Sequence, residues 1–161
     1  MPGVSDAVQR VRDALDAGGV TAPIHTFDDA VPTAAAAAEQ LGCDVGAIAN
    51  SLVFRVGDDD VVLVLASGAH RVDTRRVATH LGVGRRQVRR ADPDRVLAVT
   101  GQQVGGVAPV GHETPLTTLV DTALRAFDVV WAGAGDEHAM FPATVDELLA
   151  LTGGTELEVG D

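Results

Sequence analysis

Two apolar stretches on either side of an acidic turn constrain the fold of this chain more than any other feature. Residues 48–56 read IANSLVFRV, residues 61–67 read VVLVLAS, and the intervening residues 57–60 read GDDD. Runs rich in valine, leucine and isoleucine that are separated by a short polar turn are typical of β-hairpins. The sequence therefore predicts an antiparallel hairpin at 48–67.

The first strand of this hairpin is interrupted by two adjacent polar residues, Asn50 and Ser51. Neighbouring side chains of a strand point to opposite faces of the sheet, so one of the two is expected to face inward. A buried amide without hydrogen-bond partners costs about 1–3 kcal/mol. Asn50 therefore needs either a partner within the fold or a role in function.

Capping residues divide the rest of the chain into short helices and strands. A helix is expected to follow each of the N-cap residues Ser5, Thr33, Asp73, Asp92 and Thr144. Further strands are expected at 24–27, 87–90, 116–121, 128–134 and 156–159, and a structured loop at 101–115. Because strands and helices do not alternate regularly, we predict one α+β domain over residues 1–161 rather than a doubly wound sheet.

The charge of the chain is unevenly distributed. The formal net charge is −11, which argues against non-specific binding of nucleic acid, and all twelve basic residues are arginine. Eight of these arginines lie between Arg71 and Arg95 with only three aspartates, so this segment carries a net charge of +5. The segment is either a binding surface for one anionic partner or a solvated surface of Arg–Asp pairs.

Several classes of protein are disfavoured by the sequence. The single cysteine, Cys43, excludes an internal disulfide and a multi-cysteine metal site, and no HExxH or CxxC motif is present. No apolar run has the length of a membrane span, and the N-terminus lacks the apolar core of a signal peptide, so a cytoplasmic protein is expected. The segment GQQVGG matches neither the dinucleotide-binding motif GxGxxG nor a phosphate-binding P-loop, and no cofactor is expected. Ser67 and His70 lack the context of a nucleophile elbow, which disfavours a serine hydrolase.

The loop GGVAPVG at 105–111 is a candidate site. Glycines let a backbone approach a ligand closely and present N–H groups to an oxyanion, and Pro109 would stiffen that approach. The alternative is an ordinary long connection, but loops of this length are often functional.

Taken in order along the chain, these motifs resemble the YbaK/ProX family of aminoacyl-tRNA deacylases, which are related to the editing domain of bacterial prolyl-tRNA synthetases. The resemblance covers about residues 23–154 and is carried mainly by IANSLVF and GGVAPVG. Supporting segments are Thr33 with the alanine-rich helix, SGAHRVD, TGQQ, LVD and DELLALTGG.

The resemblance implies a single domain with a mixed, largely antiparallel sheet and flanking short helices. It also implies a trans-editing enzyme that hydrolyses the ester between a wrong amino acid and the terminal adenosine of a tRNA, by attack of water, without a metal or an acyl-enzyme. The expected partners are the acceptor end of an aminoacyl-tRNA and an aminoacyl-tRNA synthetase.

The resemblance also assigns roles to individual residues. The catalytic residues would be Asn50, Gly105 and Gly106, together with His138, which could relay a proton near neutral pH. Thr33, Ser51, Pro109 and Asp136 would bind substrate. The arginine-rich segment, rather than the resemblance, predicts that Arg71, Arg75 and Arg76 bind tRNA. An exposed turn is the alternative interpretation of the segment that holds Asp136 and His138.

The chain departs from the family at one position. Asn50 occupies the place of the family's lysine, and an amide forms hydrogen bonds but carries no positive charge. Arg55 or Arg71 could supply that charge. Two alternatives to the deacylase remain: a non-catalytic binding module that has lost turnover with the lysine, and an unrelated small-molecule hydrolase on the same fold.

Overall fold

The computed structural model describes residues 5–160. Helices are α1 (Asp6–Ala17), α2 (Ala34–Leu41), α3 (Thr74–Leu81), α4 (Pro93–Thr100) and α5 (Val145–Thr152), with short 3-10 helices η1 (Val45–Ala47), η2 (Arg85–Gln87) and η3 (Thr122–Ala126). Strands are β1 (His25–Thr26), β2 (Ile48–Val56), β3 (Asp60–Ser67), β4 (Val88–Arg90), β5 (Thr117–Asp121), β6 (Val130–Gly133), β7 (Ala139–Ala143) and β8 (Thr155–Leu157). None of the helices within residues 5–160 has the combined length and apolarity needed to cross a membrane.

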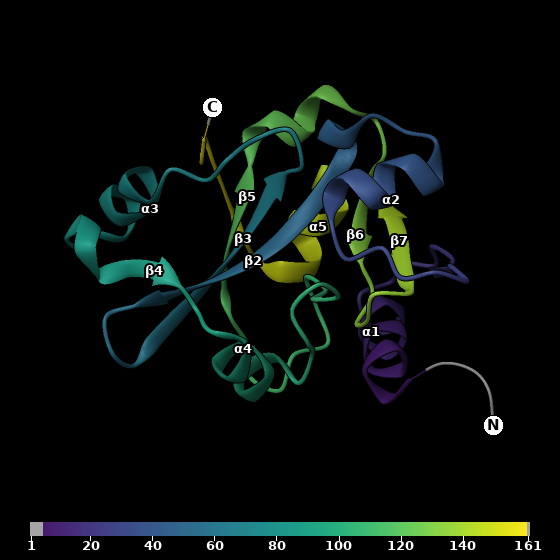
Figure 1. Cartoon of the computed structure of the whole chain (residues 1–161), viewed down its shortest axis with the longest axis horizontal. Coiled ribbons are helices and arrows are strands. Elements are labelled where there is room, and N and C mark those ends of the chain that lie inside the picture. The colour runs from purple at the N-terminus through teal and green to yellow at the C-terminus, as the bar shows by residue number, and fades with distance from the viewer. Residues whose placement is uncertain (1–4, 161) are drawn as a thin grey trace.

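The strands form one mixed sheet in the order β1-β7-β6-β2-β3-β5-β8, with β4 paired to the far end of β2. Four pairings are antiparallel and three are parallel, which confirms the predicted α+β fold with its mixed sheet. The β2–β3 hairpin runs through the middle of the molecule; α3 and β4 lie toward one end of it, and α2, β6 and β7 toward the other (Figure 1).

Local sequence signals set most helix boundaries. The side chain of each predicted N-cap accepts a hydrogen bond from an amide in the first turn of its helix. Gly42, Gly82, Gly101 and Gly153 end their helices in the left-handed conformation that glycine tolerates best. The five predicted helices and the hairpin are therefore confirmed.

One strand was not expected from the sequence. Residues Ala139–Ala143 form β7, which pairs antiparallel with both β6 and β1. Pro142 disfavours a strand because it cannot donate to the ladder, yet here it stands opposite Trp131 within the sheet. The interpretation of residues 133–141 as an exposed turn is therefore wrong for β7, and in the turn that precedes β7 Ala134 is fully buried while His138 is exposed.

The two faces of the sheet pack against different helices. Ala49 and Val53 of β2 join the main core with Val11 and Leu15 of α1 and the fully buried Phe141. Phe54, on the opposite face, packs in a second core that includes Val77 of α3. A third, smaller cluster places Ala37 and Ala38 of α2 against Ile48 and Met140.

The sheet is open along one edge of β2. Strand β6 pairs only with Ile48 and Ala49, and β4 pairs only with residues 54–56. Between them, the side of β2 that faces away from β3 has no paired strand at Asn50, Ser51 and Leu52 in the described residues. This gap in the sheet positions the candidate site.

Candidate active site

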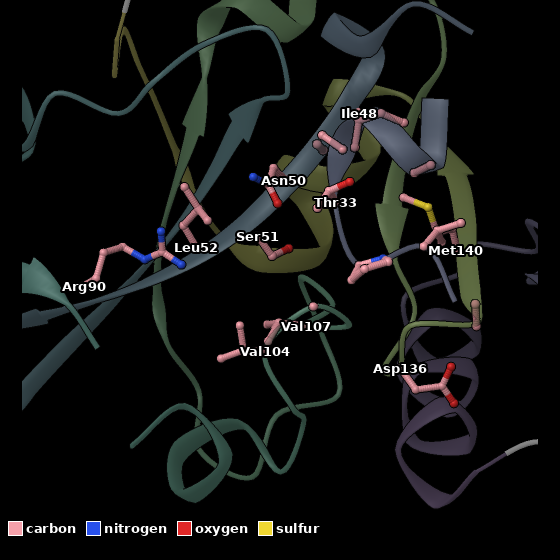
Figure 2. A pocket seen from close by; sticks show the side chains of 18 residues that line it. Thr33, Ile48, Asn50, Ser51, Leu52, Arg90, Val104, Val107, Asp136 and Met140 are labelled. Carbon is pink, nitrogen blue, oxygen red and sulfur yellow. The ribbon is translucent and has the colours of Figure 1, made fainter. Parts of the chain in front are cut away.

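A pocket of about 250 Å³ lies at the gap between β4 and β6. Figure 2 shows its walls, which come from five segments that are distant in the sequence. Strand β2 contributes residues 48–52, the start of α2 contributes Thr33 and Ala34, and the loop after α4 contributes Val104, Gly105 and Val107; Gly133, Asp136, Met140 and Arg90 complete it. The pocket therefore contains Asn50, Ser51, Thr33, Gly105 and Asp136, five of the residues that the sequence predicted for the site.

Asn50 and Ser51 both line this pocket and both have unused hydrogen-bonding groups. The Asn50 side chain is half-buried and makes no hydrogen bond within residues 5–160. The Ser51 Oγ is buried and also lacks a partner in this part of the chain. Buried polar groups are nearly always satisfied, so such groups on a pocket wall are typical of a ligand site.

The backbone of Ser51 also faces the gap. The N–H and C=O of one residue in a strand point to the same edge, and this direction alternates along the strand. The Val53 carbonyl accepts a hydrogen bond from the Ala91 amide (2.9 Å), on the β4 side of β2. Ser51, two residues earlier, therefore presents its N–H and C=O to that same edge, where no strand of the described chain pairs with it.

The glycine loop supplies a second set of donors. Within the loop, the Gly106 amide donates to the Gln103 carbonyl (3.0 Å) and the Ala108 amide donates to Gln102 Oε1 (2.7 Å). The amides of Gly105 and Val107, which line the pocket, have no acceptor within residues 5–160. Backbone N–H groups that have no acceptor within the fold are candidate donors to an oxyanion.

Gly106 lies beside the 135–137 turn and not on the pocket wall. A Cβ at this position would lie 2.4 Å from the Asp136 backbone. The Gly106 carbonyl accepts a hydrogen bond from the Gly135 amide (2.9 Å). Gly106 therefore lets the loop pack directly on the 135–137 turn. Pro109 is buried and likewise lies outside the pocket lining.

The loop is held from inside by Gln102, which sequence reasoning did not identify. Its side chain is 1% exposed; Nε2 donates to the Val110 carbonyl (3.1 Å), and Oε1 accepts from Ala108. His112 adds a further contact through Nε2, which lies 2.6 Å from the Ala108 carbonyl. Because a carbonyl only accepts, Nε2 carries the proton in this pair.

The burial of the His112 ring predicts a pH dependence of stability. Burial lowers the pKa of His112 below its ordinary value of 6.5, while the Ala108 hydrogen bond partly opposes that shift. Below about pH 6.5 the unfolded chain takes up a proton that the folded protein resists, so stability falls with falling pH and is constant above this range. Melting temperatures measured between about pH 5 and 7.5 should show this decline, and His112→Gln should reduce it. Parallel pH profiles of the two proteins would contradict the assignment.

Thr33 places the start of α2 on the pocket wall. Its Oγ1 accepts a hydrogen bond from the Ala36 amide (3.1 Å), which caps the helix. The positive end of the α2 dipole is consequently near Asn50, where it favours a ligand with partial negative charge.

Asp136 and His138 are arranged differently from the expectation. The carboxylate of Asp136 accepts hydrogen bonds from the Ser5 hydroxyl (2.9 Å) and the His138 amide (2.8 Å), and it points away from Asn50 and Ser51 (Figure 2). The His138 ring is exposed, with Nδ1 3.2 Å from the Phe27 carbonyl, and lines a separate hollow beside Ser5 and Leu97. The structure does not bring His138 to the pocket that holds Asn50.

Among the described arginines, Arg90 lines the pocket, and sequence reasoning did not single it out. It stands opposite Phe54 in the β2–β4 pairing, and its guanidinium lies 5.8 Å from the centre of that ring. Arg55 lines a different hollow, and Arg71 is exposed outside the pocket. Arg75 and Arg76 lie within 3.3 Å of Asp73 and 3.7 Å of Glu158, respectively.

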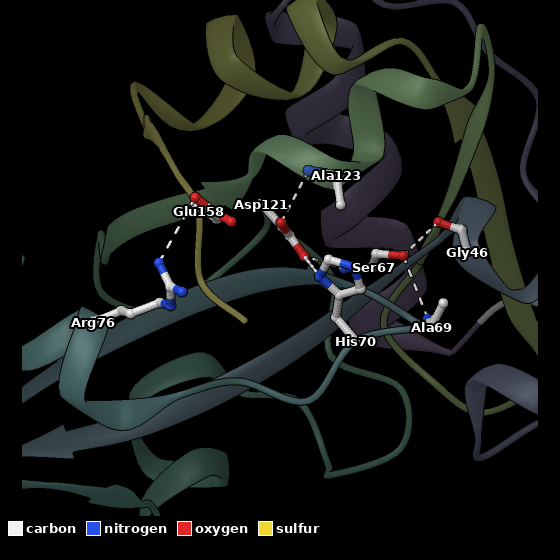
Figure 3. A network of polar contacts seen from close by, with 8 residues as sticks. All are labelled: Gly46, Ser67, Ala69, His70, Arg76, Asp121, Ala123 and Glu158. Atoms are coloured by element: carbon white, nitrogen blue, oxygen red, sulfur yellow. Dashed lines mark hydrogen bonds and ion pairs between the residues drawn. The ribbon is translucent and has the colours of Figure 1, made fainter. Parts of the chain in front are cut away.

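Ser67, His70 and Asp121 form a polar cluster at the end of β3 (Figure 3). The Ser67 hydroxyl is buried and donates to the Gly46 carbonyl (2.8 Å), while Asp121 accepts from the Ser67 and Ala123 amides. His70 Nδ1 lies 3.3 Å from Asp121 but without the alignment of a hydrogen bond. Because the hydroxyl is already engaged with backbone, this cluster ties strands together and does not form a nucleophile site. Within residues 5–160 no three His, Cys, Asp or Glu side chains are grouped as metal ligands.

Comparisons with known proteins show what this chain is similar to. The uncharacterized protein YwhH of Bacillus subtilis is 31% identical over 125 residues, which are 78% of this chain and 78% of that protein. Proline–tRNA ligase of Trichlorobacter lovleyi is 28% identical over 117 residues, which are 71% of this chain and 20% of the ligase. A crystal structure described as a candidate trans-editing enzyme for prolyl tRNA synthetase superposes with a TM-score of 0.90 at 38% identity and covers 99% of each chain.

The family assignment follows from a profile as well as from single relatives. The aminoacyl-tRNA editing domain model matches residues 28–151, which include Asn50, the glycine loop and Arg90. This confirms the resemblance inferred from the sequence motifs. The chain belongs to the family of aminoacyl-tRNA editing domains.

Proposed function

We propose that this protein is a cytoplasmic trans-editing enzyme that hydrolyses the ester of a mischarged aminoacyl-tRNA. The observation that carries the proposal is the set of unpartnered hydrogen-bonding groups around one pocket: the Asn50 amide, the Ser51 hydroxyl and the N–H groups of Gly105 and Val107. Hydrogen-bonding groups that the fold leaves unpartnered around one pocket are suited to an ester carbonyl and its oxyanion.

The chemical step needs only water and these groups. Water attacks the ester carbonyl carbon, the C–O bond to the ribose breaks, and the proton of the attacking water ends on the ribose hydroxyl. We assign the free loop amides to the carbonyl oxygen that becomes negative in the transition state. We assign Asn50 to the orientation of the ribose or the attacking water, and Ser51 to the aminoacyl group.

The apolar part of the pocket is suited to an amino-acid side chain. Val31, Ala37, Ile48 and Met140 pack together and form an apolar wall of the pocket. The specificity of such a wall comes mainly from the volume that it leaves, since one methylene changes binding by about 1–3 kcal/mol.

Arg90 is our candidate for the positive charge that the family's lysine would provide. Among the residues that line the pocket, it is the one with a cationic side chain. Arg90→Gln should reduce deacylation about tenfold, because a hydrogen bond to a charged group is replaced by one to a neutral group. Initial rates with a mischarged tRNA measure this effect. Adding Asn50→Lys to that variant should restore activity, whereas an unchanged rate in Arg90→Gln would remove Arg90 from the site.

Arg71, Arg75 and Arg76 remain our proposed tRNA contacts beyond the pocket. Replacing Arg75 and Arg76 by alanine should reduce the slope of log Kd against log salt by up to about 0.7–0.9 per lost phosphate contact. Asp73 and Glu158 compete with phosphate for these side chains, so the stated values are upper limits. Binding of uncharged tRNA at several salt concentrations measures it; an identical slope would assign both arginines to intramolecular ion pairs.

A non-catalytic binding module of the same family is the second candidate, because Asn50 replaces a lysine. It shares the pocket and the arginine-rich surface with the enzyme and differs from it only in turnover.

A further inference from the structure

A second hollow, separate from the pocket around Asn50, has arginines at half of its lining positions. It has a volume of about 380 Å³ and lies where the β2–β3 hairpin turn meets η2 and β4. Its lining consists of Arg55, Gly57, Asp58, Arg86, Gln87 and Arg89. Arginines from three different elements, β2, η2 and β4, are thus brought to one space.

The strand register forces two of these charges together. Arg55 and Arg89 stand directly opposite each other in the antiparallel β2–β4 pairing. Like charges at opposed positions repel and destabilise a sheet. An anion between the two guanidinium groups would turn this repulsion into attraction.

The arginines retain donors for such an anion. Arg55 Nε is buried and has no hydrogen-bond partner within residues 5–160. Arg89 donates one hydrogen bond, from Nε to the Arg86 carbonyl (3.2 Å), which leaves both of its terminal nitrogens without an acceptor in the described chain. The Arg86 side chain makes no hydrogen bond or ion pair there either.

The one acidic residue of the lining does not neutralise the hollow. Asp58 Oδ1 lies 3.8 Å from Arg55 Nη2, and the Asp58 side chain is 99% exposed. An exposed ion pair at this distance contributes little, so three guanidinium groups face a single, well-hydrated carboxylate. Planar guanidinium forks match the oxygens of phosphate particularly well.

The position of the hollow indicates which phosphate it would take. Arg55 follows Leu52 of the first pocket by three residues, roughly 10 Å along an extended strand. Arg55 also shares a face of β2 with Ser51 of the first pocket, because the two positions are four residues apart. We propose that Arg55, Arg86 and Arg89 bind a backbone phosphate of the tRNA acceptor strand, close to the terminal adenosine. This proposal rests on the proposed function of the first pocket.

The test measures binding of an uncharged proline tRNA transcript at several salt concentrations. Arg86→Gln with Arg89→Gln should weaken binding by about tenfold or more at low salt and reduce the log–log slope by about 1 to 2. Arg85→Gln is the matched control. Arg85 is an exposed neighbour of Arg86 in η2 that does not line the hollow, and its replacement removes the same charge. Arg85→Gln should change the slope by less than half as much as Arg86→Gln alone. Equal effects of Arg85→Gln and Arg86→Gln, or no effect of the double variant, would overturn the proposal.

A titration with inorganic phosphate distinguishes the sources of the anion. A site for a nucleic-acid backbone should bind free phosphate weakly, and the double variant should lose this binding. Tight phosphate binding with unchanged tRNA binding would assign the hollow to a free anion and contradict the proposal. Failure of the proposed function would appear in a different assay, in which the wild-type protein hydrolyses no aminoacyl ester. Binding of uncharged tRNA requires no hydrolysis, so it tests the hollow whether or not the protein is an enzyme.

Discussion

Replacing Asn50 by alanine should reduce deacylation about 10- to 100-fold, the loss expected when one positioned hydrogen bond worth about 1.5–3 kcal/mol is removed. The melting temperature should change little, because the Asn50 side chain is half-buried and makes no hydrogen bond within residues 5–160. The measurement pairs initial rates on a mischarged tRNA with thermal unfolding of the same samples. A lower melting temperature with unchanged activity per folded molecule would show that Asn50 is structural.

The substitution Asn50→Lys is a sharper form of the same experiment. It restores the residue that the resemblance places at this position, beside Ser51 and the α2 N-terminus. Activity should hold or rise. If the protein is instead a binding module, wild type will be inactive on every mischarged tRNA, and any turnover will be seen only in Asn50→Lys.

Gly106→Ala should reduce deacylation by about 100-fold or more, because a displacement of about 1 Å in a site can have that effect. The added Cβ would lie 2.4 Å from the Cα and carbonyl carbon of Asp136, and these backbone atoms cannot move away as a flexible side chain could. The loop must then shift, and the amides of Gly105 and Val107 shift with it. The same collision should also lower the melting temperature.

Gly84→Ala is the matched control for this change. It adds the same methyl group at a position where nothing lies within 4 Å of the new Cβ and where the backbone angle φ is −71°. Stability and activity should both stay close to those of wild type. Normal activity in Gly106→Ala would show that the loop does not have to pack on the 135–137 turn for the site to work.

Much of this fold could be predicted because its signals are local. The N-cap residues and the glycines after each helix act within a single turn, so Ser5, Thr33, Asp73, Asp92 and Thr144 all mark helix starts. The β2–β3 hairpin is equally local, since its two strands and their turn are contiguous. Strand β7 was missed because Pro142 argues against a strand and because its partners, β6 and β1, are set by tertiary packing.

The candidate site could be predicted only in part from the sequence, because some of its residues are brought together by tertiary packing and not by local signals. Asn50 and the glycine loop are identifiable as motifs. Arg90 is not, because it reaches the pocket only through the pairing of β4 with Phe54 and its neighbours. The gap at Ser51 depends on where β6 ends and β4 begins, which no local pattern encodes. The separation of His138 from Asn50 likewise follows from the bend of the chain between β6 and β7.

The most direct test of the editing function is a deacylation screen of the wild-type protein against a panel of mischarged tRNAs. We expect release of the amino acid from at least one of them, with a rate that depends on the amino acid and falls in Asn50→Ala. The correctly charged tRNA for the same acceptor serves as the control. If wild type releases no amino acid from any member of the panel while still binding tRNA, the pocket is not a deacylase site, and the proposed enzymatic function is wrong.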